Sequence, residues 1–134
     1  MSIIDELSLE PHPEGGYYRR TYTAPMTVET AGGVRPAATL IHFFLPAGDS
    51  SAWHKVASDE IWLWHGPGIL VLEIGDRQVT LGPPASGHAQ QACVPGGVWQ
   101  RTLPGDDDVL VSCLVSPGFD FADFELDELD EQPT

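Results

Sequence analysis

The chain has little positive charge. Its 134 residues include twenty Asp and Glu but only six Lys and Arg, which gives a formal net charge of −14. A nucleic-acid-binding face needs basic side chains to neutralise phosphates, and an anionic membrane surface attracts the same side chains. The composition therefore argues against both as partners. Ten of the acids lie between Asp106 and Glu131, and we interpret this run as a solvated tail.

Cysteine is also scarce, and long apolar runs are missing. Cys93 and Cys113 each lie in an apolar segment, which predicts two buried free thiols and no disulfide. No CxxC or Cys/His finger spacing occurs, so a structural zinc site is not expected. The N-terminus is acidic and unlike a signal peptide, and no apolar run approaches the roughly 20 residues of a membrane helix. We expect a cytoplasmic protein.

Turn-forming residues, by contrast, are plentiful. Fourteen glycines and twelve prolines separate short β-branched and aromatic runs, a pattern typical of an all-β sandwich or barrel. We predict one domain over 1–134, with a core of about 9–126, an acidic tail of about 127–134 and a short N-terminal helix starting at Ser2. The segment 119–129 fits either a short helix or an irregular stretch. Strands are predicted near 17–23, 38–45, 51–56, 60–65, 69–74, 78–81, 90–94, 98–102 and 109–116.

One stretch of the sequence brings a histidine and a carboxylate close together. His54 lies on a predicted strand, and the next strand carries Glu60, Trp62 and Trp64 on one face. If this face is interior, the imidazole and the carboxylate meet in a cavity lined by aromatic rings. Gln100, on a strand that follows a Pro-Gly-Gly turn, is a candidate to hydrogen-bond a substrate there.

His54 and Glu60 are candidate proton-transfer groups. A carboxylate beside an imidazole selects its tautomer and raises its pKa, and burial raises the pKa of the carboxyl group. Such a pair suits reactions next to a carbonyl group. The competing interpretation is a core histidine satisfied by Glu60. Trp62 and Trp64 either stack on a sugar or base or fill the core, and nothing marks Cys113 as an activated nucleophile, so we expect it to form a cavity wall.

An anionic substrate would need a cation, and two arginines follow one another on the first long strand. Alternation sends one of Arg19 and Arg20 inward and the other outward. A guanidinium facing the cavity could bind a phosphate or carboxylate bidentately. The alternative is an ion pair with one of the many surface acids.

These motifs resemble the cupin superfamily. His54 and Glu60 match its first motif and Pro95 and Gly97 its second, whereas Val56 and Gln100 stand where the superfamily has histidine ligands. The stretches PHPEGGYYR, SAWHKVASDEIW, VPGGVWQ and PGFDFADFE look like those of one small single-domain cupin family, known as a domain of unknown function. His42 and Arg20 depart from its pattern. The resemblance implies a double-stranded β-helix, the RmlC-like jelly-roll barrel, and commonly a homodimer.

The resemblance also raises the question of a metal. Cupins with four intact ligands hold Fe, Mn, Zn or Ni, but here only His54, Glu60 and Gln100 remain at those positions. His42 could compensate only if its strand faces the same cavity. We therefore expect no cofactor, with a divalent metal on those three residues as the alternative.

The sequence thus predicts a cupin that binds a small polar ligand, such as a sugar, a sugar phosphate or a nucleotide-like molecule. If it is an enzyme, we expect an isomerase or epimerase in which His54 and Glu60 transfer protons. The expected substrate contacts are Gln100, Trp62, Trp64, Arg19, His42 and Cys113. The alternatives are a metal-dependent oxygenase or isomerase, and a binding module without catalysis.

Overall fold

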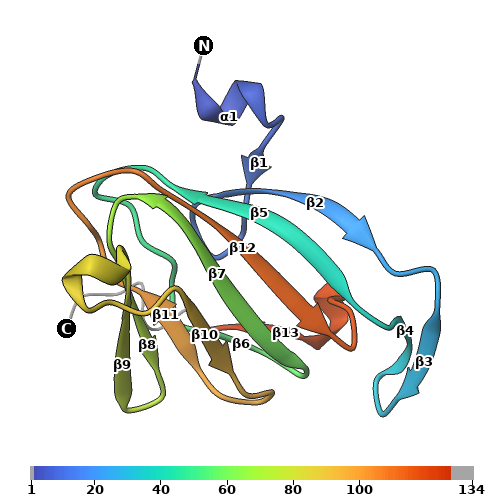
Figure 1. The fold of residues 1–134 in the computed structure, drawn as a ribbon. Helices are drawn as coiled ribbons and strands as arrows, with labels where there is room; N and C mark the ends of the chain where they lie inside the picture. The colour runs from blue at the N-terminus through green and yellow to red at the C-terminus, as the bar shows by residue number, and fades with distance from the viewer. Residues whose placement is uncertain (1, 128–134) are drawn as a thin grey trace.

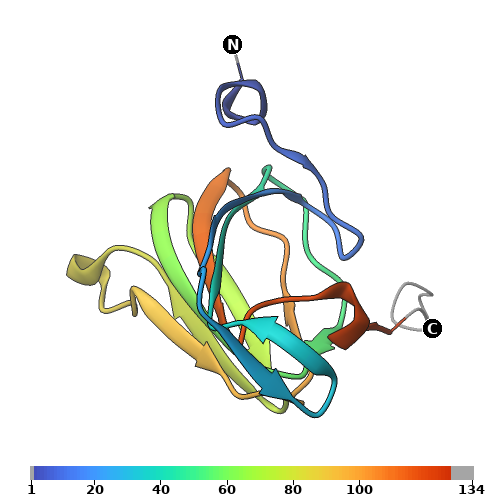
Figure 2. The ribbon, with the colours of Figure 1, turned by 90° about the vertical axis from the view of Figure 1, so that its right-hand side faces the viewer.

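Two antiparallel sheets face each other in the computed structural model, which describes residues 2–127 (Figure 1, Figure 2). The six-stranded sheet has the order β1-β2-β5-β12-β7-β10 and the five-stranded sheet the order β13-β6-β11-β8-β9. A separate hairpin, β3-β4, extends from the edge of the molecule. The predicted all-β jelly roll is confirmed, as a two-sheet sandwich and not as a closed barrel.

The elements are short, as the spacing of turn residues predicts. The larger sheet consists of β1 (Glu10–Pro11), β2 (Tyr17–Thr23), β5 (Thr39–Leu45), β12 (Val109–Ser116), β7 (Asp59–Pro67) and β10 (Gln91–Val94). The smaller consists of β13 (Phe124–Leu126), β6 (His54–Val56), β11 (Gln100–Thr102), β8 (Leu70–Ile74) and β9 (Arg77–Leu81). The hairpin is β3 (Thr27–Thr30) with β4 (Gly33–Pro36), and the helical turns are α1 (Ile3–Glu6), η1 (Pro84–Ser86) and η2 (Phe121–Asp123).

All nine predicted strands are present, although β6 and β11 are shorter than expected. The short helix is also present, and the Ser2 hydroxyl caps it by accepting a hydrogen bond from the Asp5 amide. The undecided segment is part 3-10 turn (η2) and part strand (β13), and the predicted tail beyond residue 127 lies outside the described residues. The β3-β4 hairpin was not predicted, because its exposed strands carry no apolar alternation.

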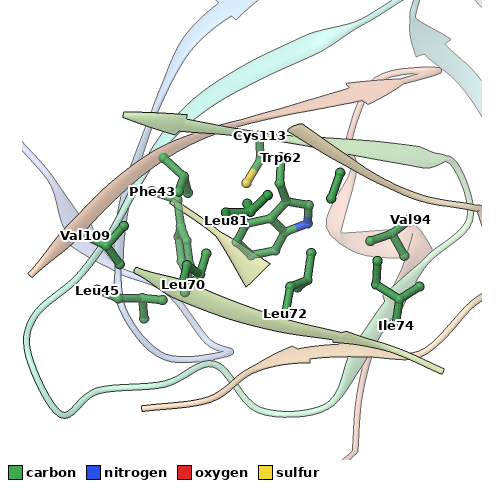
Figure 3. Packing of buried hydrophobic residues seen from close by; sticks show 12 residues of the cluster. Phe43, Leu45, Trp62, Leu70, Leu72, Ile74, Leu81, Val94, Val109 and Cys113 are labelled. Carbon is green, nitrogen blue, oxygen red and sulfur yellow. The ribbon is translucent and has the colours of Figure 1, made fainter. Parts of the chain in front are cut away.

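The apolar core lies between the two sheets (Figure 3). The burial pattern of β8 alternates along the strand, so Leu70, Leu72 and Ile74 point into the core. From the opposite sheet, Phe43 and Trp62 meet edge to face with ring centroids 5.8 Å apart. This core holds β5, β7 and β12 in register, and the candidate site lies beside it on the same sheet face.

No helix among the described residues has the length and apolar character needed to cross a membrane.

Candidate functional site

A cavity of about 410 Å³ lies beside the core and is lined by several polar and ionisable side chains. Glu60 and Trp62 reach it from β7, His54 from β6 and Cys113 from β12. Its size is typical of pockets that hold small molecules. The structure therefore brings the predicted pair, His54 and Glu60, to one cavity, with Trp62 and Cys113 in its wall.

The carboxyl group that contacts His54 belongs to Glu14, which is not among the predicted site residues and lies in the motif PHPEGGYYR. His54 Nε2 lies 3.3 Å from Glu14 Oε1, whereas no ion pair joins His54 to Glu60 within residues 2–127. Two glycines after Glu14 turn the chain, and Gly15 adopts a φ of +109° against the Ser50 carbonyl. The motif PHPEGGYYR contained the signal, since it places a histidine and a carboxylate directly before a strand.

Hydrogen bonds define where the protons lie on these groups. His54 Nδ1 lies 2.7 Å from the Ala52 carbonyl oxygen, which can only accept, so Nδ1 carries a proton. In neutral His54 the lone pair of Nε2 then faces Glu14, and a proton must lie between them. His12 Nδ1 accepts a hydrogen bond from the Glu14 amide at 3.1 Å, so neutral His12 carries its proton on Nε2.

The pKa directions agree with a proton held on Glu14. Burial and the nearby Glu60 raise the pKa of Glu14 well above its usual value. Burial lowers the pKa of His54 to about 4, against the opposing hydrogen bond to Ala52, and the pKa of His12 to about 4 as well. The raised pKa expected for His54 from the sequence is wrong, because desolvation outweighs the hydrogen bonding of this imidazole. At neutral pH the pair is a protonated Glu14 beside a neutral His54.

Gln100 forms a hydrogen bond with the carboxyl group of Glu60. Gln100 Nε2 donates to Glu60 Oε1 at 2.9 Å, while Gln100 Oε1 accepts from Trp62 Nε1 at 2.9 Å. Burial raises the pKa of Glu60 to about 7, although the hydrogen bonds from Gln100 and Cys113 lower this pKa in part. A carboxyl group with that pKa exchanges its proton readily near neutral pH.

Gln100 itself is fully buried and is not among the residues that line the cavity. Both ends of its amide are occupied by protein groups, and its strand pairs it directly with His54. It thus connects the two sheets and orients Glu60. The expectation that Gln100 contacts substrate stays a prediction. In the structure Gln100 reaches the cavity indirectly, through its hydrogen bond to Glu60.

Two other expected site residues, Trp64 and His42, do not line the cavity. Trp64 packs against the core and donates its indole N–H to the Gly68 carbonyl at 2.7 Å. His42 alternates with the cavity-lining Ile41 and Phe43 and lies near His65 on the other sheet face, with ring centroids 6.4 Å apart. Cys93, expected to be buried, is exposed because β10 turns it to that outer face, and both cysteines are free.

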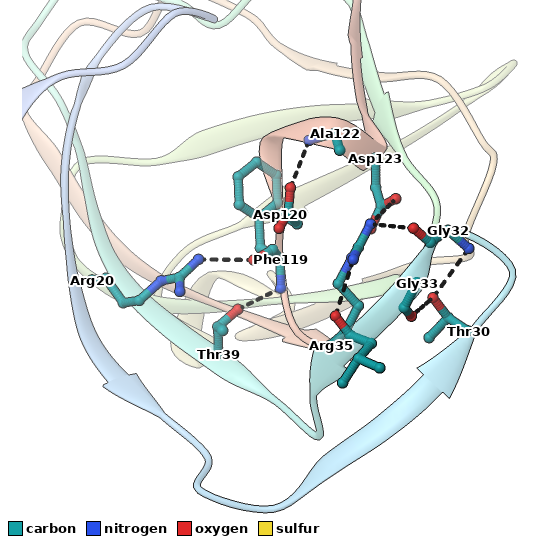
Figure 4. A network of polar contacts seen from close by, with 11 residues as sticks. Arg20, Thr30, Gly32, Gly33, Arg35, Thr39, Phe119, Asp120, Ala122 and Asp123 are labelled. Atoms are coloured by element: carbon teal, nitrogen blue, oxygen red, sulfur yellow. Dashed lines mark hydrogen bonds and ion pairs between the residues drawn. The ribbon is translucent and has the colours of Figure 1, made fainter.

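Of the two arginines, Arg20 has the register of a cavity residue. Arg20 pairs with Ile41, whose side chain lines the cavity, whereas Arg19 pairs with His42, which does not, although both arginines border the cavity. Arg20 Nη2 donates to the Phe119 carbonyl at 2.9 Å (Figure 4). The residue that departs from the expected family pattern is therefore the one at the mouth.

The segment 117–124 closes one side of this mouth. The Phe119 amide donates to Thr39 Oγ1 at 2.9 Å, and Asp123 forms a two-point ion pair with Arg35 of the hairpin (Figure 4). Phe119 and Phe121 line the cavity from this segment. The aromatic mouth was not predicted, because the segment's secondary structure could not be assigned from its sequence.

The donor atoms expected for a metal do not converge. The oxygen of Gln100 is taken by Trp62, Val56 has no ligating atom, and His42 lies on the other face. Within residues 2–127, no group of three His, Cys, Asp or Glu side chains is placed to hold a metal ion. The side chains present do not fit a cupin metal centre, so the chemistry of this cavity is derived from protein groups alone.

Comparison with known proteins agrees with this architecture. An uncharacterised protein of Saccharomyces cerevisiae, YML079W, is 34% identical over 143 residues, spanning 90% of this chain and 71% of the yeast protein. A hypothetical protein from Leishmania major superposes with a TM-score of 0.83 at 34% identity, covering 91% of this chain and 83% of that one.

Two further structures extend the comparison. Protein SO0799 from Shewanella oneidensis has a TM-score of 0.83 at 34% identity, covering 92% of this chain and 81% of that one. KdgF from Halomonas sp. has a TM-score of 0.65 at 17% identity, covering 88% and 93%, a likeness of fold alone. The family described as "Cupin superfamily (DUF985)" matches residues 1–127. The chain belongs to this family of cupins.

Proposed function

We propose that the chain binds a small carbonyl compound, such as a sugar, in its cavity and moves a proton on it as an isomerase or epimerase. The observation that carries the proposal is the meeting of two separate proton-holding groups at one cavity of about 410 Å³. These are Glu60 and the Glu14–His54 pair. Both are buried beside aromatic walls, where water competes little for the protons.

The proposed reaction needs no oxidant or cofactor. Ionised Glu60 takes a proton from the carbon next to the carbonyl group, and the electron pair of the broken C–H bond forms an enolate. The Glu14–His54 pair supplies its proton to the enolate oxygen or to a carbon. In an α-hydroxy carbonyl compound, an isomer forms when the former carbonyl carbon takes a proton while the neighbouring hydroxyl gives its own proton back to the pair and becomes the new carbonyl group. Return of a proton to the opposite face of the same carbon gives an epimer. A Glu60 pKa of about 7 suits this role at neutral pH.

The test is hydrogen exchange in D₂O. Aldoses, ketoses, uronic acids and their phosphates are incubated with the protein, and NMR follows deuterium entering at carbon, which detects proton transfer even without net turnover. Glu60→Gln, His54→Ala and Glu14→Gln are each expected to lower the exchange rate by about 100-fold or more. Glu29→Gln, at an exposed position on β3, is the matched control and is expected to keep full activity.

Full activity in Glu60→Gln or His54→Ala would contradict the proposal. Saturable ligand binding with no exchange on any compound of the panel would identify a binding module instead. Elemental analysis of untagged protein purified without chelator tests the expectation of no cofactor. One transition-metal ion per chain, lost in His54→Ala, would favour the metal-dependent alternative.

A further inference from the structure

The charge around the cavity mouth differs from that of the whole molecule. Of the six basic residues, Arg35, Lys55 and Arg101 form ion pairs with Asp123, Glu125 and Glu73. Arg19 and Arg20 have no carboxylate partner within residues 2–127, and both border the cavity. Two unpaired guanidinium groups at one opening are a concentrated positive charge in a chain with a net charge of −14.

The acids of the cavity do not cancel this charge. Glu14 holds its proton, Glu60 is only partly ionised near pH 7, and His12 and His54 are neutral. Glu10 is the remaining carboxylate in the lining, and it is exposed and hydrogen-bonded to Tyr18. At physiological ionic strength charges beyond about 8 Å are largely screened, so a ligand at the mouth responds to the arginines more than to distant surface acids.

Arg20 is held in place but keeps most of its donors. One N–H of its guanidinium, on Nη2, donates to the Phe119 carbonyl, and Phe119 is itself anchored through its amide to Thr39 (Figure 4). An arginine has five N–H donors in a rigid fork, and the others have no hydrogen-bond acceptor within residues 2–127. An immobilised guanidinium with spare donors is well suited to a two-point bond with a carboxylate or phosphate.

The cavity that Arg20 and the acid–base groups share has aromatic walls. Tyr18, Phe43 and Trp62 line the cavity from the sheet, and Phe119 and Phe121 line it from the closing segment. The ring of a bound ligand would pack against these aromatic side chains, while an anionic group on the same ligand would lie at the mouth beside Arg20.

We propose that the ligand of this cavity is a small organic anion whose carboxylate or phosphate binds Arg20 at the mouth while its uncharged ring lies against the aromatic walls. The inference rests on the proposed function only in placing the ligand in the same cavity. Arg20, rather than Arg19, is the residue that selects for a negatively charged ligand.

The experiment compares four probes that share one phenyl ring. Phenylacetate and phenyl phosphate carry the two anionic groups, phenylacetamide is neutral, and benzyltrimethylammonium is a cation. Binding is measured by NMR titration of the isotope-labelled protein at pH 7. We expect at least one anion to bind about tenfold more tightly than the neutral probe and the cation, because hydrogen bonds between charged partners exceed neutral ones. The better anion distinguishes carboxylate from phosphate.

Four variants assign the effect to charge at Arg20. Arg20→Gln is expected to remove the preference for the anion, and Arg20→Lys to keep part of it because the charge remains without the planar fork. Arg77→Gln changes the net charge equally at an exposed position at the start of β9 and is expected to alter affinity less than about twofold. Thr39→Val breaks the other anchor of Phe119 without changing charge; because Thr39 also lines the cavity, it is expected to weaken binding of all four probes alike and to leave the preference for the anion in place.

Three results would overturn the inference. The cation or the neutral probe could bind as well as both anions, Arg20→Gln could keep the preference, or Thr39→Val could abolish it as fully as Arg20→Gln does. These outcomes are separate from the failure of the proposed function. Glu60→Gln and His54→Ala are expected to bind the anion within a few-fold of wild type even where they lose proton transfer. An anion preference without any exchange would leave the inference intact and remove the catalytic proposal.

Discussion

At the scale of single residues, Gln100 shows how one buried amide serves both sheets. It pairs with His54 across the strand register, donates to Glu60 and accepts from Trp62. All of these partners are buried. Each bond therefore replaces one that water would otherwise supply, and its loss leaves a buried group without a partner.

Replacing Gln100 with methionine is expected to destabilise the protein. Gln100→Met keeps the volume but leaves the Trp62 N–H and a Glu60 oxygen unpaired, a loss of about 2–4 kcal/mol in the free energy of unfolding. Urea denaturation measures it. Gln78→Met, at an exposed position, is the control and should change stability by less than about 0.5 kcal/mol. Equal stabilities of the two variants would show that the Gln100 bonds contribute nothing net.

The raised pKa of Glu60 predicts that the stability of the protein depends on pH. Its pKa is about 7 in the folded protein and 4.5 in the unfolded chain, so the folded state binds more protons between these values. The stability it contributes is fully present below pH 4.5, falls as the pH rises and is lost above about pH 7. Wild type should therefore lose stability relative to Glu60→Gln across this window, by an amount on the order of 3 kcal/mol.

Urea unfolding of both proteins from about pH 5 to about pH 8 checks this prediction. His12 and His54, with pKa values lowered to about 4, act in the opposite direction and lose stability as the pH falls. Their contribution is present in both proteins and cancels in the difference to first order. A difference that stays constant over the range would mean that Glu60 titrates at its ordinary pKa.

At the scale of elements, the turn before β2 positions the proton-holding pair. Gly15 has a φ of +109°, and a Cβ there would lie 2.5 Å from the Ser50 backbone oxygen. The Ala52 amide donates to the Glu14 carbonyl at 2.8 Å, which joins the same two segments. Glu14 and His54 thus meet because one tight turn packs against the segment that leads into β6.

Alanine at Gly15 is expected to separate this pair. Gly48, with a φ of +84° and no atom within 4 Å of where a Cβ would lie, is the matched control, because both substitutions place a side chain at a positive φ and only Gly15→Ala adds a clash. Gly15→Ala should reduce proton exchange by about tenfold or more, while Gly48→Ala leaves it within a few-fold. Equal loss of exchange in the two variants would show that the turn does not control the site.

At the scale of the whole molecule, surface charge opposes folding. Twenty acids repel one another against six bases, and salt screens repulsion more than it weakens the few ion pairs because the acids are so much more numerous. The melting temperature should rise as sodium chloride increases from about 10 mM to about 300 mM, which calorimetry measures. A falling melting temperature would mean that ion pairs such as Arg35–Asp123 outweigh the repulsion.

The homodimer expected from the family resemblance stays a prediction. Light scattering coupled to size-exclusion chromatography should give the mass of two chains. A mass of one chain at all concentrations would contradict it. The expected cytoplasmic location likewise stays a prediction, and fractionation of the source cells tests it.

The sequence alone determined the secondary structure and the family motifs. Strand positions follow from local alternation between turn residues, and the motif spacing placed His54 and Glu60 at one cavity, as the structure does. Both signals are local, since they depend on neighbours along the chain. Local patterns did not predict the β3-β4 hairpin and η2, because their ends are held by contacts between residues far apart in the sequence, such as Arg35 with Asp123.

The tertiary structure decided which groups meet and in what state. Glu14, far from His54 in sequence, becomes its partner, and Gln100 bonds to Trp62 and Glu60 instead of lining the cavity. Arg20, and not Arg19, shares the register of the cavity-lining Ile41. The protonation of these groups also depends on burial, which no local pattern specifies. Long-range packing sets both distance and desolvation, and for that reason the acid–base character of the cavity could be derived only from the folded chain.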